Sequence, residues 1–383
     1  MRKIIEGSYA VAETIKLIGP KVVSAYPITP QTHIVEALAD YKANGNVSYE
    51  YVLAESEFAA ASIVAGAAAR GVRVYSATSS QGLLLMTEVL FNIAGMRFPV
   101  VLTVANRAVS GPINIWNDQQ DAVTIRDSGW IMLYAEDNQE AADMHLEAYK
   151  IAESVRLPVM VNMDGYVLTH TYEPVDMASE KEVRKFLPDY NPPKGSYLDV
   201  KNPRTIGAFA TPETYMQIRE DLFNVMEKSR STIKKVHADF KKQFKRSGGD
   251  GLVEGYKLKD AEIVLVSFGS VLGTIKDTVD ELRAKGQKVG ILKIRCFRPF
   301  PFNDINKYLS KAKHIAVIEK CVSIGYEGIL ASEVRAACYN KNVTDNISSF
   351  IVGLGGKDVT KDNIKEIIKK SKTTKKRVEF IYS

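Results

Sequence analysis

The sequence predicts an α/β protein with parallel sheets in two domains, and three observations lead to this fold class. Short β-branched runs alternate with helical patterns through the first half of the chain. The alternation stops at a long basic helical pattern and restarts after a Gly/Ser cluster at 247–251. The chain has 383 residues, 45% of them hydrophobic, which is enough for more than one core. Such alternation implies parallel strands covered by helices on both faces.

The first domain follows from apolar runs of strand length that alternate with longer segments of helical spacing. Its expected strands are 22–26, 49–52, 72–77, 99–105, 131–135 and 158–163. Its expected helices are 31–43, 55–70, 82–95 and 138–155, and glycines follow the first two of them at Gly45 and Gly71. A polar stretch with prolines, 187–193, then interrupts the pattern.

The rest of the chain is predicted to hold one long helix and a second, smaller α/β domain. The helix covers 212–245. After it come expected strands at 263–268, 289–294, 315–318 and 350–353 and expected helices at 271–285, 327–340 and 362–370. We therefore divide the chain into a first α/β domain at 1–185, a helical connector and linker at 186–255, and a second α/β domain at 256–383.

Charge and hydropathy argue against two classes of partner. The net charge is +6, with basic residues crowded at 228–246 and 365–377. Apolar side chains recur at helical spacing along the first run, so we interpret it as an amphipathic helix with a solvated basic face, not a nucleic-acid site. The longest small, apolar run, 59–69, is too short to span a bilayer. We expect a cytoplasmic protein that binds neither nucleic acid nor membrane.

The cysteines and histidines do not form a metal-binding pattern. The cysteines, Cys296, Cys321 and Cys338, are far apart and include no Cys-x-x-Cys pair. The five histidines are scattered, with no pair one helical turn apart. We therefore expect no metal site on this chain, and any iron–sulfur chemistry would belong to another chain.

A threonine between two prolines is the first candidate site. Thr29 lies in the segment Pro27-Ile28-Thr29-Pro30, where an expected strand ends and a helix begins. Ligands collect at such strand ends in parallel sheets. One interpretation is a helix start, with Thr29 as N-cap and Pro30 in the first turn. The other is that Thr29 and the free helical N–H groups hold a small anion.

Charged residues follow two further strands. Glu55 and Glu57 precede an Ala-rich, apparently buried helix, where acids are ordinary stabilisers of the helix start. A buried carboxyl group there is also suited to proton exchange. Arg107 ends the fourth expected strand, and an arginine there suits bidentate capture of a carboxylate. The long polar loop 110–121 follows it, and such loops are usually functional or mobile.

These segments, in this order, resemble the alpha subunits of multi-subunit 2-oxoacid:ferredoxin oxidoreductases. The resemblance covers nearly the whole chain. Within the family, the segment 106–118 is more similar to the pyruvate branch than to the branched-chain branch, and the 2-oxoglutarate branch is less similar. The matching motifs are 26–30 (YPITP), 55–57 (ESE), 78–86 (TSSQGLLLM), 106–108 (NRA), 126–130 (RDSGW), 297–301 (FRPFP) and 352–358 (VGLGGKD).

The resemblance implies a fold and a role for individual residues. The first domain would be a pyrimidine-type thiamine-diphosphate-binding domain, and the second would be similar to the C-terminal domain of transketolases. Thr29 and Arg107 would bind the carboxylate of the 2-oxoacid. Glu57 would bond the pyrimidine ring of the cofactor and take part in catalysis, with Glu55 as the alternative, and Pro27 and Ile28 would also contact the cofactor.

The resemblance also implies which groups lie on partner chains. The beta subunit would hold Mg²⁺ and the cofactor diphosphate, and [4Fe-4S] clusters would lie on partner subunits among beta, gamma and delta. Gly249-Asp250-Gly251 imitates the start of a magnesium and diphosphate motif, but the asparagine expected after it is missing from 252–295. We interpret that segment as a linker. The active site would then lie between chains, and this chain alone would be inert.

The activity implied is the thiamine-diphosphate-dependent oxidative decarboxylation of pyruvate with coenzyme A, which gives acetyl-CoA, CO2 and reduced ferredoxin. The first alternative is the same reaction on branched-chain 2-oxoacids. The second, from a different class, is a non-catalytic scaffold or basic binding protein that has kept the fold. Loss of the Thr29 hydroxyl or the Arg107 charge would leave turnover unchanged only in that second case.

Overall fold

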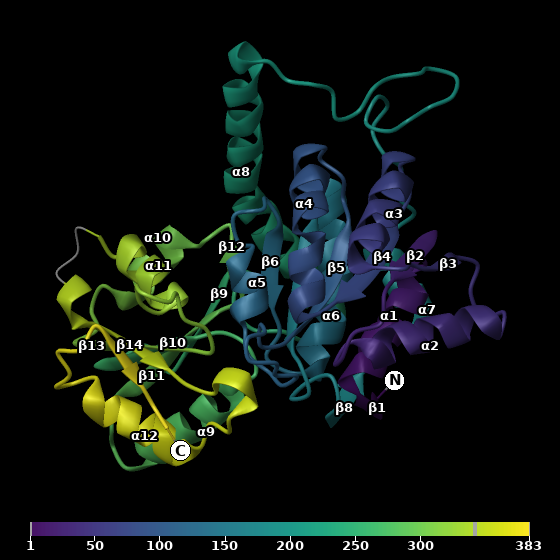
Figure 1. The fold of residues 1–383 in the computed structure, drawn as a ribbon. Helices are drawn as coiled ribbons and strands as arrows, with labels where there is room; N and C mark the ends of the chain where they lie inside the picture. The colour runs from purple at the N-terminus through teal and green to yellow at the C-terminus, as the bar shows by residue number, and fades with distance from the viewer. Residues whose placement is uncertain (1, 340–342, 383) are drawn as a thin grey trace.

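The computed structural model describes residues 2–339 and 343–382. The strands in these residues form a seven-stranded sheet, a six-stranded sheet and a two-stranded pair (Figure 1). Helices cover both large sheets, so the protein has the expected α/β fold with mainly parallel strands. None of the helices in the described part of the chain is long and apolar enough to cross a membrane.

The larger sheet has the strand order β12-β6-β7-β5-β4-β2-β3. All neighbours are parallel except β12, which runs antiparallel to β6. The parallel strands β2, β4, β5, β6 and β7 are almost entirely buried, as strands covered on both faces must be, whereas the edge strand β3 is partly exposed. The bounds are β2 Val22–Ala25, β3 Glu50–Leu53, β4 Val74–Thr78, β5 Val101–Asn106, β6 Ile131–Tyr134, β7 Val159–Asp164 and β12 Cys296–Arg298.

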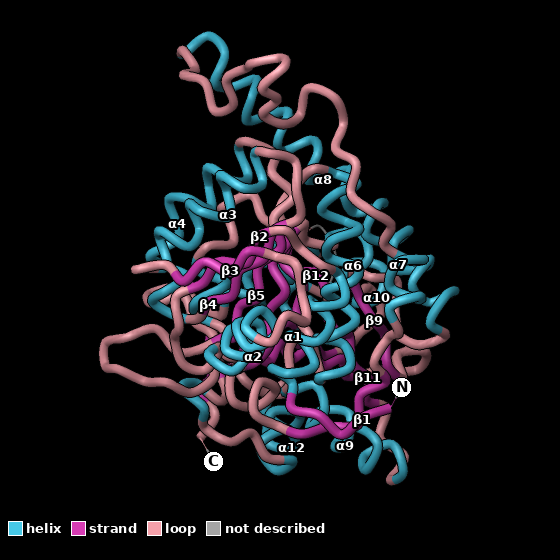
Figure 2. Tube along the Cα trace, turned by 90° about the vertical axis from the view of Figure 1, so that its right-hand side faces the viewer, coloured by secondary structure: helices cyan, strands magenta, loops and turns pink. Residues whose placement is uncertain are grey.

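Helices cover this sheet on two sides. In Figure 2, α3 and α4 lie on one side of the strands and α6 on the other. Helix α3 is rich in alanine, which allows the close packing of α3 against α4 and β2. Helices α1 and α2 pack together beside α6 and β3. The bounds are α1 Gly7–Ile18, α2 Thr32–Ala43, α3 Glu57–Ala69, α4 Ser80–Gly95, α5 Gln120–Thr124 and α6 Asn138–Val155.

The smaller sheet has the order β15-β14-β13-β10-β11-β9, and only its edge strand β9 is antiparallel. Helices α9 and α12 pack together on it, and α10 and α11 form a second pair. The strands are β9 Val253–Tyr256, β10 Ile263–Ser267, β11 Val289–Ile294, β13 His314–Glu319, β14 Ile347–Ile351 and β15 Val378–Phe380. The helices are α9 Val271–Ala284, α10 Phe302–Leu309, α11 Ile329–Ala337, η1 Thr344–Asn346, η2 Leu354–Gly356 and α12 Lys361–Lys370.

The connection between the sheets contains α7 (Glu180–Phe186) and the long α8 (Pro212–Phe244). Helix α8 begins with Pro212 in its first turn, and its C-terminal half packs against α6. Its N-terminal half projects beyond the body of the molecule (Figure 1). The predicted long helix is therefore confirmed to within one residue at its end.

Several elements were not expected from the sequence. The N-terminal strand β1 (Arg2–Glu6) pairs antiparallel with β8 (Tyr172–Asp176) and leads directly into α1. Strand β12 crosses from the second half of the chain to join the larger sheet beside β6. These strands are short, and their pairing depends on partners far away in the sequence, which local periodicity does not report.

Candidate active site

The candidate site lies where β2, β4, β5 and β7 end. These strands are neighbours and parallel, so their carboxyl ends meet at one edge of the larger sheet. The segments that follow them carry Thr29, Arg107 and the loop 110–119, and α3 places Glu57 beside the start of α4.

Arg107 is held against the Thr29 segment. Its side chain is only 6% exposed, its Nη1 donates to the carbonyl oxygen of Thr29 at 2.9 Å, and its Nε donates to the carbonyl oxygen of Asn114 at 3.0 Å. Burial lowers the pKa of Arg107, while the nearby Tyr166 and Asp121 act in the opposite direction. Because a guanidinium has five N–H donors, the remaining ones are available to an anionic ligand.

Asp121 fixes the backbone around this arginine. It is completely buried, and its carboxylate accepts from the backbone N–H groups of Ser80 and Arg107 at 3.0 Å each and from Asn106 Nδ2 at 2.9 Å. Burial raises the pKa of Asp121 to about 7, although these three hydrogen bonds lower it. The carboxylate thus ties the turn after β4 to the end of β5. Sequence analysis missed Asp121, because nothing local distinguishes it from a loop carboxylate.

The prediction that Thr29 caps a helix is wrong. Helix α2 begins at Thr32, and Gln31 occupies its N-cap position without a side-chain cap. The Gln31 side chain instead donates to the carbonyl oxygens of Tyr26 at 2.9 Å and Ala77 at 3.3 Å, which pins this turn to the sheet before the helix starts. In residues 2–339 and 343–382, the exposed Thr29 hydroxyl has no hydrogen-bond partner, so it is free for a ligand.

Glu57 is buried and Glu55 is exposed. Glu57 is the first residue of α3 and is 7% exposed, and Ser56 caps the helix by accepting from the N–H of Ala59. The Glu57 carboxylate lies against Gly82 of α4, where an added Cβ would come within 2.5 Å of Glu57 Oε1. Within the described residues, this carboxylate has no hydrogen-bond or ion-pair partner.

Buried polar atoms without partners gather around these strand ends. Thr78 Oγ1, Gln31 Oε1 and Gln81 Nε2 are buried and have no hydrogen-bond partner in the described part of the chain. Thr78 Oγ1 would also lie 2.6 Å from a Cβ added to Gly82, on the same side as Glu57. Buried polar groups are normally hydrogen-bonded, so these atoms mark a place for the polar groups of a ligand. A heteroaromatic ring with several nitrogen atoms fits this set of donors and acceptors.

The second half of the chain contacts the loop after β5 and holds it in place. Asn114 Nδ2 donates to the carbonyl oxygen of Gly355 at 3.1 Å, and Lys320 Nζ donates to Asn117 Oδ1 at 2.7 Å. Gly356 has a φ of 84°, and a Cβ there would lie 2.3 Å from Cβ of Trp116, so only glycine fits. Ile113 and Trp116 in this loop are 79% and 52% exposed. Sequence analysis did not predict this contact, although the glycines of the 352–358 motif were its signal.

Comparisons with known proteins agree with this architecture. Residues 13–238 match the family described as "Pyruvate flavodoxin/ferredoxin oxidoreductase, thiamine diP-bdg", and residues 261–364 match "Pyruvate:ferredoxin oxidoreductase core domain II". The chain is 50% identical over 369 residues to pyruvate synthase subunit PorA of Methanocaldococcus jannaschii, covering 96% of this chain and 94% of that protein. It is 42% identical to ketoisovalerate oxidoreductase subunit VorA of Pyrococcus horikoshii, covering 96% and 93% of the two chains.

A solved structure extends the likeness to the fold. The 2-oxoglutarate:ferredoxin oxidoreductase from Magnetococcus marinus, solved with 2-oxoglutarate, coenzyme A and succinyl-CoA bound, superposes with a TM-score of 0.76 at 21% identity. The likeness covers 97% of this chain but only 65% of that longer chain.

The two sheets, the polar strand edge and these matches define an oxidoreductase subunit of the class that contains a thiamine-diphosphate-binding α/β domain. The chain belongs to the pyruvate flavodoxin/ferredoxin oxidoreductase family.

Proposed function

We propose that this chain is the alpha subunit of a pyruvate:ferredoxin oxidoreductase, which converts pyruvate, coenzyme A and oxidised ferredoxin to acetyl-CoA, CO2 and reduced ferredoxin. The observation that carries the proposal is the buried Arg107, fixed by 2.9 and 3.0 Å hydrogen bonds beside the Thr29 hydroxyl, which has no hydrogen-bond partner within the described residues. The name of the relative with 50% identity supports pyruvate as the 2-oxoacid.

Thr29 and Arg107 bind and orient the substrate carboxylate in this proposal. The free N–H groups of Arg107 pair with the carboxylate, and the Thr29 hydroxyl donates a further hydrogen bond. Because the Arg107 side chain is fixed to two backbone carbonyl oxygens, the carboxylate position is set before the substrate arrives. A preorganised binding group of this kind lowers the entropy that must be lost on the way to reaction.

Glu57 holds the pyrimidine ring of thiamine diphosphate, with Pro27 and Ile28 contacting the cofactor from the segment after β2. The Glu57 carboxylate, which has no partner in the part of the chain that the structure describes, exchanges a proton with a ring nitrogen, and Thr78 and Gln31 offer further polar contacts. When bound, the cofactor supplies the electron sink for decarboxylation. The burial of Glu57 and exposure of Glu55 favour Glu57 for this role.

The remaining components lie on other chains in our proposal. Beta, gamma and delta subunits complete the complex, with Mg²⁺ and the cofactor diphosphate on beta and [4Fe-4S] clusters on the partner subunits. We propose a cytoplasmic location and the domain division 1–185, 186–255 and 256–383, with the smaller sheet in the last part apart from β9, which begins at Val253. The relatives' designation as subunits supports an enzyme that acts only in an assembly.

A branched-chain 2-oxoacid is the second candidate substrate. The 42% identity to a ketoisovalerate oxidoreductase subunit supports this alternative. The exposed Ile113 and Trp116 are placed to limit the size of the substrate side chain. Since each methylene is worth only about 1–3 kcal/mol of discrimination, we expect overlapping activities.

The testing experiment is dye reduction by the native complex captured through this chain, with coenzyme A and a panel of 2-oxoacids. Pyruvate is expected to give the fastest reduction. A preference for 3-methyl-2-oxobutanoate would keep the mechanism and change the substrate. If no 2-oxoacid reduced the dye, in a complex shown to contain thiamine diphosphate and its clusters, the scaffold alternative would replace the proposal.

A second test addresses Glu57. The Glu57→Gln variant is expected to lower kcat of the assembled complex by about 10²-fold or more, because a positioned proton-transfer group contributes that much. The matched control is Glu55→Gln, which changes an exposed glutamate close to Glu57 in the sequence. This variant is expected to retain normal turnover. A normal kcat in the Glu57→Gln variant would contradict the proposed proton-transfer role of Glu57.

A further inference from the structure

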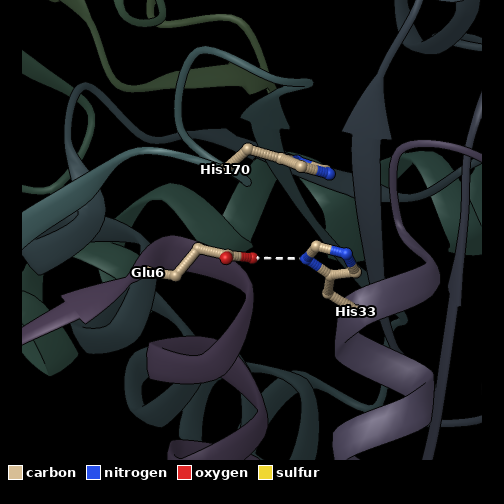
Figure 3. A group of neighbouring side chains, drawn as sticks. All are labelled: Glu6, His33 and His170. Carbon is tan, nitrogen blue, oxygen red and sulfur yellow. Dashed lines mark hydrogen bonds and ion pairs between the residues drawn. The ribbon is translucent and has the colours of Figure 1, made fainter.

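A second cluster of chemically active side chains lies outside the site described above. Glu6, His33 and His170 come from three separate elements: the end of β1, the first turn of α2 and the loop between β7 and β8 (Figure 3). One potential ligand atom from each of the three lies within 4.8 Å of the other two. The histidines share no helical turn, so their spacing in the sequence gave no sign of this cluster.

The cluster contains a buried carboxylate with no cationic partner of fixed charge. Glu6 is 5% exposed, and its only side-chain partner in the described part of the chain is His33 Nδ1, at 2.7 Å from Oε1. No lysine or arginine pairs with Glu6 in residues 2–339 and 343–382. A buried carboxylate is normally paired or coordinates a metal, and within the described residues only the His33 imidazole pairs with this one.

The hydrogen bonding of His170 leaves one ring nitrogen free to coordinate. Its Nδ1 lies 2.7 Å from Thr169 Oγ1, which already accepts from the backbone N–H of Tyr166. Thr169 is completely buried, and its hydroxyl oxygen has a second lone pair that can accept from His170 Nδ1–H. In the tautomer in which Nδ1–H donates to this oxygen, the lone pair lies on Nε2, which is the arrangement found for histidines that bind metals.

We propose that Glu6, His33 and His170 form a binding site for a divalent transition metal ion, with Zn²⁺ as the best fit. Two imidazoles and one carboxylate are a common protein ligand set for Zn²⁺. Tetrahedral coordination at the usual Zn–N and Zn–O distances separates the ligand atoms by about 3.4 Å. In the structure, Glu6 Oε1 and His33 Nδ1 are 2.7 Å apart, and the ligand atoms of all three residues lie within 4.8 Å of one another. These separations bracket the tetrahedral value, so small side-chain movements complete the site.

Three protein ligands leave a fourth position for water or a small anion. His33 is 37% exposed on its side chain, so solvent reaches the cluster from that side. The ion would therefore be exchangeable. It would join α2 more firmly to the other two segments, which hydrogen bonds such as that from the Ser8 N–H to the carbonyl oxygen of Thr169 at 3.1 Å already connect to each other.

The site is adjacent to the segment that carries Thr29. His33 lies in the first turn of α2, directly after the turn that contains Pro30. On the other side of the cluster, Gly165 packs so closely on Pro30 that an added Cβ would lie 2.6 Å from its Cγ. The rings of Tyr166 and His170 are 4.7 Å apart, so the same loop supports the cluster and Pro30. Metal binding would stiffen this part of the strand edge.

The test is titration of the full-length chain, without a polyhistidine tag, with Zn²⁺ by isothermal calorimetry. We expect one equivalent to bind and to raise Tm. Removing a residue that only supports a metal ligand lowers the metal affinity about 10–100-fold. The His33→Gln and His170→Gln variants remove a ligand itself, so each should weaken Zn²⁺ binding at least tenfold. His314→Gln, in the other sheet, is the matched control and should bind as the parent does.

Spectroscopy of Co²⁺ bound to the unmodified chain tests the same site without any substitution. Tetrahedral Co²⁺ absorbs visible light far more strongly than octahedral aqueous Co²⁺, and Zn²⁺ should bleach the spectrum by displacement. Equal Zn²⁺ affinity in the parent chain and both histidine variants would overturn the proposal. Failure of the parent chain to bind Zn²⁺, or a weak octahedral Co²⁺ spectrum, would do the same.

Discussion

Arg107 uses two of its donors on the backbone carbonyl oxygens of Thr29 and Asn114, so its guanidinium group is held by backbone atoms. One of those carbonyls belongs to Thr29, whose hydroxyl is exposed and unpartnered in the described residues. The backbone of Thr29 therefore holds the arginine, while its side chain remains available to a ligand. These two roles can be separated by substitution, because changing the side chain leaves the carbonyl in place.

Thr29→Val is predicted to raise KM for the 2-oxoacid by about 10- to 100-fold, since a hydrogen bond to a charged group contributes about 1.5–3 kcal/mol. Thr29→Ser keeps the hydroxyl and should stay close to the parent value. Steady-state kinetics of the assembled complex measure both, and KM for coenzyme A should not change. Equal KM values for the valine and serine variants would show that the hydroxyl does not contact the substrate.

Gly82→Ala is predicted to weaken the binding of thiamine diphosphate. The added methyl group would lie 2.5 Å from Glu57 Oε1 and 2.6 Å from Thr78 Oγ1, which forces the carboxylate away. Overpacking costs about 1–3 kcal/mol, so the half-saturating cofactor concentration should rise about tenfold or more.

The matched control for this substitution is in the same helix. Gly95→Ala, at the end of α4, places its methyl group in open space, with nothing within 4 Å. It should leave cofactor affinity unchanged, as measured by reactivation of cofactor-depleted complex. Similar affinities in the two variants would contradict the placement of the cofactor beside Glu57.

At the scale of elements, charged side chains join α6 to β11 and the segment after it. Glu140 of α6 accepts from Lys293 Nζ at 2.8 Å and from Arg295 Nε at 3.0 Å. Arg295 also donates to the buried Glu147 at 3.0 Å. Burial alone would raise the pKa of Glu140, but the charges and hydrogen bonds of Lys293 and Arg295 outweigh it and lower the pKa to about 2. The network joins the first half of the chain to the second.

The low pKa of Glu140 gives its stabilising effect a defined pH window. Because the folded-state pKa lies below the unfolded value of 4.5, the unfolded chain binds more protons in between, and stability falls as pH drops from about 4.5 to about 2. Glu140→Gln should reduce the free energy of unfolding by about 1.5–3 kcal/mol at neutral pH. The difference in the free energy of unfolding between the parent chain and the variant should shrink as pH falls through that range. Urea denaturation of both chains measures it, and a pH-independent difference would be inconsistent with this ion pairing.

Sequence patterns predicted the long helix and the parallel strands better than the antiparallel strands β1 and β12, for a physical reason. The α8 helix and the parallel strands have strong local periodicity, so their positions were predicted to within a few residues. In β1 only the last residue is buried and β12 has only 3 residues, so neither forms a buried apolar run, and both depend on pairing with distant strands.

The candidate site was likewise predicted only in part from the sequence. Arg107 and Glu57 were candidates because their residue types stand out at strand ends. Asp121 and the glycines at 355–356 act through contacts that only the folded chain creates.

At the scale of the whole molecule, one face of the smaller sheet shares a hydrophobic core with the larger sheet, while its other face packs against α9 and α12 in a separate cluster. A continuous cluster of buried residues extends from the larger sheet into the smaller one. At the junction, the ring of Tyr134 in β6 lies 4.4 Å from that of Phe268, which follows β10, and 6.2 Å from that of Phe297 in β12. An interface of this kind is closer to a domain interior than to a hinge.

This shared core predicts that the full chain unfolds in a single cooperative transition, although chains of this length with two sheets often unfold in two. Differential scanning calorimetry should give one peak, and Phe297→Ala should lower its Tm without splitting it. The substitution removes a completely buried ring and should cost about 3–5 kcal/mol. If the halves were independent, Phe297→Ala would separate two peaks and shift them unequally. A single shifted peak means that a side chain carried by one half stabilises both, because β12 completes the sheet that carries the candidate site.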